Sequence, residues 1–169
     1  MPPGGWQSPM PQQGAGWAGR PLSGWWPRVG AQILDGLILT IPVIVLTLII
    51  VGVAAGSDTG AIVTGILGFL AYFIAVLFYA PVLMARGGER NGQTLGKQAL
   101  GITVIRDSGE PFDLGAAFVR ELVVKNLLFG FVGSFFFSIP TILNYLWPLW
   151  DDQNRCLHDM VVKTHVIKT

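Results

Sequence analysis

Two long runs of apolar residues dominate the first half of the chain, and each is long enough to cross a membrane. The first occupies residues 29–55 and reads VGAQILDGLILTIPVIVLTLIIVGVAA, and the second occupies residues 61–85. A helix needs about 20 predominantly apolar residues to span the hydrocarbon core of a bilayer. The link between the runs, residues 56–60, is short and carries no lysine or arginine. The pattern therefore predicts a tight antiparallel pair of membrane helices.

Small residues and tyrosines recur along one face of the second run, at alternating spacings of four and three residues. This spacing places them on a single stripe of a helix. Small side chains let two helices approach closely within a lipid environment. We therefore expect the second helix to pack on the first through Ala61, Gly65, Gly68, Tyr72, Ala75 and Tyr79.

A polar stretch, residues 86–113, follows the second run and carries the basic residues that the first link lacks. They are Arg86, Arg90, Lys97 and Arg106. Because basic loops stay on the cytoplasmic side of a membrane, we expect this loop and the N-terminus to be cytoplasmic. Residues 101–110 and 160–168 both have the β-branched character of strands. We predict that they pair, which requires a cytoplasmic C-terminus as well.

The region between those two strands, residues 114–150, is the most ambiguous part of the chain. It starts amphipathic, with Glu121 and Lys125 at the spacing of a helical ion pair, and becomes strongly apolar at residue 127. A single crossing would place the C-terminus outside the cell. Two short segments, or a re-entrant hairpin that breaks near residues 138–140, would return it to the cytoplasm. The basic residues of the tail favour the return.

These elements predict an all-α membrane protein with a small cytoplasmic β element. Its parts are a helical hairpin and a third, interrupted hydrophobic segment that makes one crossing, or two short or re-entrant ones. Residues 1–24 are rich in proline and glycine and poor in aliphatic residues, so we expect a disordered cytoplasmic tail before one membrane domain, residues 25–169. The expected location is the cell membrane, with several passes.

Composition supports a membrane protein and narrows the classes of function. Hydrophobic residues make up 51% of the 169 residues and charged residues only 12%, whereas soluble proteins average about 25% charged residues. A net charge of +1 gives no indication of nucleic-acid binding. The single cysteine, Cys156, excludes an internal disulfide and any metal site built from several cysteines.

Asp35 is the residue of the first apolar run that most needs an explanation. A carboxylate within a membrane helix costs at least about 2.5–3.5 kcal/mol on insertion scales, so something must compensate for it. Arg28 and Gln32 share its helical face, although Arg28 lies about 10 Å away along the axis. The group is either a cation or proton site, or a structural clamp. In a clamp, Asp35 would accept hydrogen bonds from Arg120, Asn126, Tyr72 or Tyr79.

Two further motifs resemble catalytic or ligand sites without matching them. The segment Gly92-Gln-Thr-Leu-Gly-Lys97 has three residues between its glycines, where a phosphate-binding P-loop has four, and Gln98 replaces the required Ser or Thr. We expect Lys97 to face lipid phosphates or a carboxylate, with Asp159 and Asp35 as possible partners. Cys156, His158 and Asp159 provide too few ligands for zinc, so we expect a capped, solvated tail in which Asp159 binds an arginine of the loop. The sequence supports neither an enzyme nor a cofactor.

The order of these motifs resembles the RDD family, small bacterial membrane proteins named for one arginine and two aspartates. Arg28 and Asp35, in WWPRVGAQILDGLI, are similar to the family's arginine and first aspartate. The remaining similar segments are Gly92-Gln-Thr94-Leu-Gly96-Lys97, Gly101-Ile-Thr-Val104, Arg120, Leu157-His158-Asp159 and Thr164-His-Val166. His165 and Lys163 depart from the family pattern. The resemblance points to Asp159 as the second aspartate, with Asp151 and Asp152 as rivals.

The resemblance implies a fold more than a function, because the role of the family is largely undefined, with transport suggested. One hypothesis is transport of an ion or small ligand that uses Arg28 and Asp35. Too few helices exist to enclose a path, so a homo-oligomer or a larger membrane partner would complete it. The alternative is a non-transporting assembly factor or membrane anchor, in which the Arg/Asp set is structural. Both require the lipid bilayer and neither involves nucleic acid.

Reporter fusions test the predicted topology. Fusions after residues 58, 105 and 169 should report an outside, an inside and an inside location, because basic residues concentrate in the second loop and the tail. A periplasmic reporter at residue 169 would contradict both the returning third segment and the paired strands.

Overall fold

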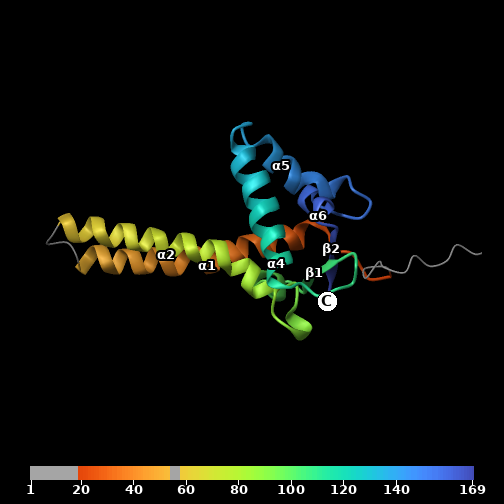
Figure 1. Cartoon of the computed structure of the whole chain (residues 1–169), viewed down its shortest axis with the longest axis horizontal. Coiled ribbons are helices and arrows are strands. Elements are labelled where there is room, and N and C mark those ends of the chain that lie inside the picture. Colours follow the sequence, from red (N-terminus) through yellow and green to blue (C-terminus); the bar gives the residue numbers. More distant parts are fainter. Residues whose placement is uncertain (1–18, 54–57) are drawn as a thin grey trace, which may run out of the picture.

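A computed structural model describes residues 19–53 and 58–169 of the chain. Most of the predicted N-terminal tail, residues 1–18, and the predicted link residues 56–57 lie outside the described residues. The described chain is mainly helical, with one small sheet. Two long helices lie along the long axis of the molecule. The other described helices and strands pack together at one end of this pair, and we call this part the head domain (Figure 1).

The pair consists of α1 (Trp25–Val53) and α2 (Asp58–Met84), which run side by side in opposite directions (Figure 1). Both helices are long and apolar enough to cross a membrane. Only 6% of either apolar window is buried within the protein, and large side chains such as Ile49 and Phe69 are exposed. So large an apolar surface is costly in water. The hairpin is consistent with a membrane protein, as the sequence predicts.

The interface between the two helices uses part of the predicted small-residue stripe. Gly65, Gly68 and Tyr72 of α2 line a narrow cavity of about 140 Å³ whose other wall comes from Leu46 and Thr47 of α1. Tyr79, the last residue of the stripe, also reaches α1, because its hydroxyl donates a hydrogen bond to Asp35. These four stripe residues therefore lie on the side that faces the first helix.

The loop after α2 contains η1 (Gly88–Arg90) and α3 (Leu95–Ala99), and then enters β1 (Ile102–Arg106). Thr94 caps α3, because its side chain accepts a hydrogen bond from the Lys97 amide at 3.4 Å. Gly92 has φ +77° and lies so close to β1 that a Cβ would approach the Val104 carbonyl oxygen to 2.0 Å. Only glycine fits this turn.

The two predicted strands pair as expected. β1 runs antiparallel to β2 (Thr164–Lys168), with Val104 opposite Val166. The end of the predicted tail also joins this sheet, because the Ser23 amide donates to the Val166 carbonyl at 2.8 Å and Leu22 bridges to Ile167. Leu22 and Ser23, which belong to the predicted tail, therefore pair with β2.

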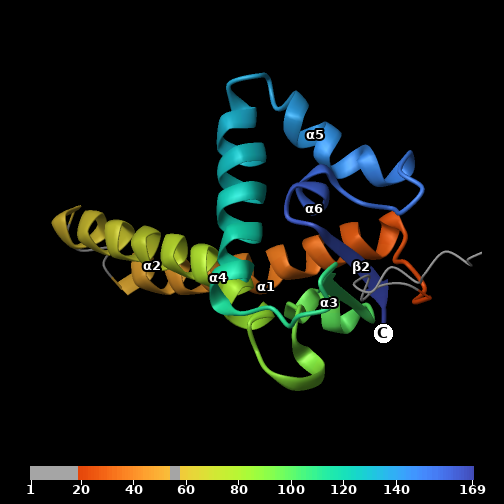
Figure 2. The same cartoon turned by 45° about the vertical axis from the view of Figure 1, so that its right-hand side comes forward.

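The ambiguous third region folds back on itself. α4 (Leu114–Phe118) continues as a wider π-helical segment, η2 (Val119–Val132), and the chain then turns at residues 133–138. Phe137 and Ser138 adopt positive φ angles of 53° and 59° there, close to the predicted break. The return path follows α5 (Ile139–Leu146), η3 (Trp147–Leu149) and α6 (Leu157–Val161) towards β2 (Figure 2).

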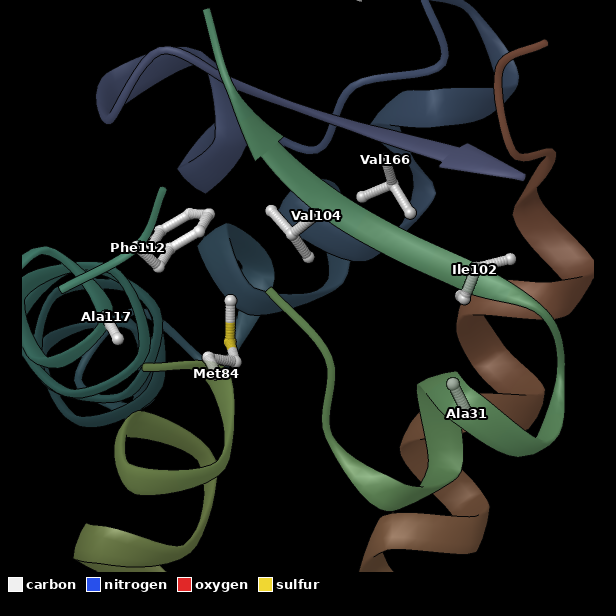
Figure 3. Close-up of a cluster of buried hydrophobic side chains, with 7 residues drawn as sticks. All are labelled: Ala31, Met84, Ile102, Val104, Phe112, Ala117 and Val166. Atoms are coloured by element: carbon white, nitrogen blue, oxygen red, sulfur yellow. The ribbon is translucent and has the colours of Figure 1, made fainter. Parts of the chain in front are cut away.

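A small apolar core joins the elements of the head domain. It brings together buried side chains from α1, the end of α2, both strands and α4 (Figure 3): Ala31, Met84, Ile102, Val104, Phe112, Ala117 and Val166. Burying one large aliphatic or aromatic side chain stabilises a fold by about 1.5–3 kcal/mol. The core therefore fixes the sheet and the loop against α1, where the polar residues gather.

Candidate functional site

The carboxylate of Asp35 is almost fully buried and accepts three hydrogen bonds. Oδ1 accepts from the Tyr79 hydroxyl and from the Gly96 amide, both at 2.7 Å, and Oδ2 accepts from the Thr94 hydroxyl at 2.6 Å. Tyr79 is one of the four partners predicted from the sequence, whereas the contribution of Thr94 and Gly96 was missed. The geometry is that of a clamp between α1, α2 and the start of α3.

Gly96 allows the clamp to close because α3 crosses α1 at very short range. A Cβ on Gly96 would lie 2.3 Å from the Ala31 carbonyl oxygen and 2.8 Å from Asp35 Oδ1. Real Cβ atoms do not make such contacts, so any larger residue must separate the two helices. The Gly-x-Thr-x-Gly pattern found in the sequence is thus the pattern that binds Asp35.

Asp159 is the second buried carboxylate, and two arginines bind it. The expectation of a solvated tail with an arginine of the loop is wrong, because Asp159 is 0% exposed and its partners belong to α1 and η2. Arg28 Nη1 donates to Oδ2 at 2.8 Å, and Arg120 Nη2 donates to Oδ1 at 2.5 Å. Asp151 instead pairs with Arg155 at 3.0 Å. Asp159 therefore fits the role of second family aspartate better than Asp151.

Arg28 and Gln32 share the helical face of Asp35, as the sequence predicts, but each binds a different partner. Arg28 binds Asp159, which is 131 positions away in sequence, and Gln32 accepts a hydrogen bond from Lys125 Nζ at 2.8 Å. Arg28 and Asp35 lie two helical turns apart on the same face of α1, which is too far for their side chains to meet. The C-terminal segment folds back and places Asp159 beside Arg28. Arg120 likewise binds Asp159 and not Asp35.

Glu121 is a buried acid at the centre of a third cluster. It accepts from Lys125 Nζ at 3.0 Å and from Lys97 Nζ at 3.5 Å, and it also contacts Arg120. The helical pair of Glu121 and Lys125 is confirmed. Lys97 faces a carboxylate as expected, although its partner is Glu121 and not the suggested Asp159 or Asp35. Burial lowers the pKa of Lys97 to about 8, although the nearby Glu121 opposes this shift.

His158 is held neutral beside Asp159. Its Nδ1 lies 2.9 Å from Asn144 Oδ1 and its Nε2 lies 3.2 Å from Arg120 Nη2. Since Arg120 can only donate, Nε2 must accept and Nδ1 must carry the proton. Burial lowers the pKa of His158 to about 3, and the Arg120 charge adds to this effect although Asp159 opposes it.

The electrostatics of Asp159 follow from this arrangement. Burial alone would raise the pKa of Asp159, but His158, Arg120 and Arg28 together hold it well below its usual range. Because His158 is neutral near pH 7, the two guanidinium groups account for the ionised state there. Asp159 is therefore a fixed negative charge with both oxygens in use.

The same contacts argue against nucleophilic or metal chemistry at Cys156, His158 and Asp159. Their potential ligand atoms lie within 4.8 Å of one another, yet a cation there would lie directly beside Arg28 and Arg120. Burial, with Asp159 adding to it, raises the pKa of the Cys156 thiol to about 12. The thiol therefore stays protonated, and a thiolate is the form that attacks or binds a metal.

All six polar residues singled out in the sequence line one cavity of about 380 Å³ between α1, η2 and α6. These residues are Arg28, Gln32, Asp35, Lys97, Arg120 and Asp159. Apolar side chains, among them Val29 and Ile33, form much of the remaining wall. A neighbouring cavity of about 200 Å³ shares Gln32, Asp35, Lys97 and Lys125 with it. The predicted residues thus share a space, although they form separate hydrogen-bonded groups.

Comparison with known families agrees with this arrangement: the model of the RDD family matches residues 22–163. The chain belongs to the RDD family. It is 25% identical to the uncharacterized protein YckC of Bacillus subtilis over 144 residues, which cover 85% of this chain and 83% of that protein. It is also 30% identical to the proline-rich antigen of Mycobacterium leprae over 105 residues, or 60% of this chain and 38% of the antigen. No solved structure matches the chain.

The buried neutral His158 makes stability depend on pH. Its pKa is about 3 in the folded protein and about 6.5 in an unfolded chain, so the unfolded state binds more protons between these values. Stability should therefore fall as the pH drops below about 6.5. Thermal unfolding of the purified protein at about pH 7.5 and about pH 5 should give a lower Tm at the lower pH. His158→Gln should have a clearly smaller difference, and an unchanged difference would contradict this account.

Proposed function

We propose that this RDD family protein is a multi-pass membrane protein that acts as a non-transporting anchor or assembly factor. In this proposal the Arg/Asp set is structural. The N-terminus and C-terminus are cytoplasmic, α1 and α2 cross the bilayer, and the segment from η2 to α5 re-enters it from the cytoplasmic side. The head domain then presents a surface to a partner, which is a second copy or a larger membrane protein.

The observation that carries the proposal is the saturation of Asp35. Its two oxygens accept three short hydrogen bonds, one from α2 and two from the start of α3. A carrier site must release its ion or proton in each cycle, whereas these fixed donors offset the cost of burying the charge. Asp159 is bound in the same way by two arginines. Both family aspartates therefore have a sufficient structural role.

Two features also argue against an enzyme. The cysteine thiol is protonated and buried, and His158 has both ring nitrogens engaged. A nucleophile needs a free base within reach. We therefore include no catalytic activity in the proposal.

Transport of an ion or small ligand is the second candidate function. The observation that favours it is the pair of adjoining cavities that share Asp35 and Lys97. In this alternative, Asp35 would titrate and several copies would complete a path.

Asp35→Asn separates the two functions. Asparagine has nearly the same shape, its oxygen can accept from Tyr79 and Gly96, and its amide can donate to Thr94. The clamp should therefore persist with a loss of about 1–3 kcal/mol of stability, because the hydrogen bonds are no longer made to a charge. The variant should fold, and Asp35→Leu should not.

Proton flux driven by Na⁺ or K⁺ gradients is then measured in proteoliposomes with a pH-sensitive dye. The anchor proposal predicts that the wild type and Asp35→Asn both match protein-free liposomes. Flux in the wild type that disappears in a folded Asp35→Asn protein would overturn it and establish transport.

A further inference from the structure

Arg28 has an unused pair of hydrogen-bond donors. Its Nη1 binds Asp159, but Nε and Nη2 are buried and have no hydrogen-bond partner among the described residues. The side chain is only 10% exposed. Nε and Nη2 form one edge of the guanidinium, and that edge matches the two oxygens of a carboxylate or phosphate. Leaving two such donors unpaired in a buried site is unfavourable, which points to a ligand.

The cavity that Arg28 lines has an excess of positive charge. Four cationic side chains line it, Arg28, Lys97, Arg120 and Lys125, against the two carboxylates of Asp35 and Asp159. Glu121 lies behind Lys97 and Lys125 and offsets one further charge. His158 adds none, since it is neutral near pH 7. One positive charge therefore remains uncompensated within about 380 Å³.

The rest of the wall fits an apolar group attached to the anion. Val29, Ile33 and Ile102 contribute aliphatic surface, and Ile33 is 57% exposed on the outer side of α1. Trp25 lines the cavity near the start of α1, and its neighbour Trp26 is 76% exposed. Tryptophans favour the headgroup level of a bilayer. The cavity thus lies where an anionic headgroup would be found.

We propose that this cavity binds a phosphate group through Arg28, either as the headgroup of an anionic lipid or as free phosphate. The Nε and Nη2 edge of Arg28 is covered by surrounding protein atoms and turns towards the cavity when the phosphate binds. The site goes beyond the anchor function, since it adds a ligand to Arg28, whose ion pair with Asp159 uses only one of its nitrogens. Lys125 lines the same cavity and would provide the second charge.

Two variants test the site in the full-length protein. Arg28→Lys keeps a positive charge for Asp159 but removes the two-donor edge. Val29→Phe leaves every charge in place and fills part of the cavity. Arg106→Lys is the matched control, because Arg106 pairs with Glu110 on the surface and does not line the cavity. Thermal unfolding identifies which variants keep the fold.

Lipid binding is measured by native mass spectrometry of detergent-purified protein with phosphatidylglycerol or phosphatidylcholine, and phosphate binding by equilibrium dialysis with labelled inorganic phosphate. A lipid site predicts preference for phosphatidylglycerol, weakened about tenfold by Arg28→Lys and by Val29→Phe but not by Arg106→Lys. If Arg28→Lys and Val29→Phe weaken the binding of inorganic phosphate, Arg106→Lys does not, and the protein shows no preference between the two lipids, the ligand is free phosphate.

Two results would overturn the site. One is wild-type protein that neither retains inorganic phosphate nor prefers phosphatidylglycerol. The other is a folded Val29→Phe protein that binds both probes as the wild type does. If Arg28→Lys fails to fold, the Val29→Phe result alone decides between these outcomes.

Discussion

The hydrogen bonding of one buried carboxylate, Asp35, determines how the parts of this protein meet. Its three donors come from α2, from the cap of α3 and from the α3 backbone. Hydrogen bonds to a charged group contribute about 1.5–3 kcal/mol each, against an insertion cost of about 2.5–3.5 kcal/mol. The carboxylate is therefore stable in this place only while all three elements stay together. Its burial requires the loop to be folded against the hairpin.

Asp159 performs the complementary task for the C-terminal segment. It joins α6 to the start of α1 through Arg28 and to η2 through Arg120. The two aspartates thus attach opposite parts of the chain to one helix, and the cavity lies between them. The ion pair with Asp159 fixes one end of the Arg28 guanidinium beside this cavity.

The elements of the fold were predictable because their signals are local. Apolar length defined α1 and α2, and β-branched residues defined the pair of β1 and β2. The six polar site residues were also found, since charges within an apolar chain are conspicuous. Their partners were not, because Thr94 meets Asp35 across 59 positions and Arg28 meets Asp159 across 131. The first contact depends on how the loop after α2 folds onto α1, and the second on how the third region folds back, and helical spacing carries no information about either.

The close crossing at Gly96 offers the most direct measurement of the clamp. Gly96→Ala adds one methyl group against the Ala31 carbonyl and Asp35, whereas the matched Gly87→Ala meets nothing within 4 Å. In thermal unfolding of the purified full-length protein, Gly96→Ala should lower the Tm by about 4 °C or more, because overpacking here separates α3 from α1. Gly87→Ala should leave the Tm unchanged. Equal Tm values for the two variants would contradict a structure that depends on the Asp35 clamp.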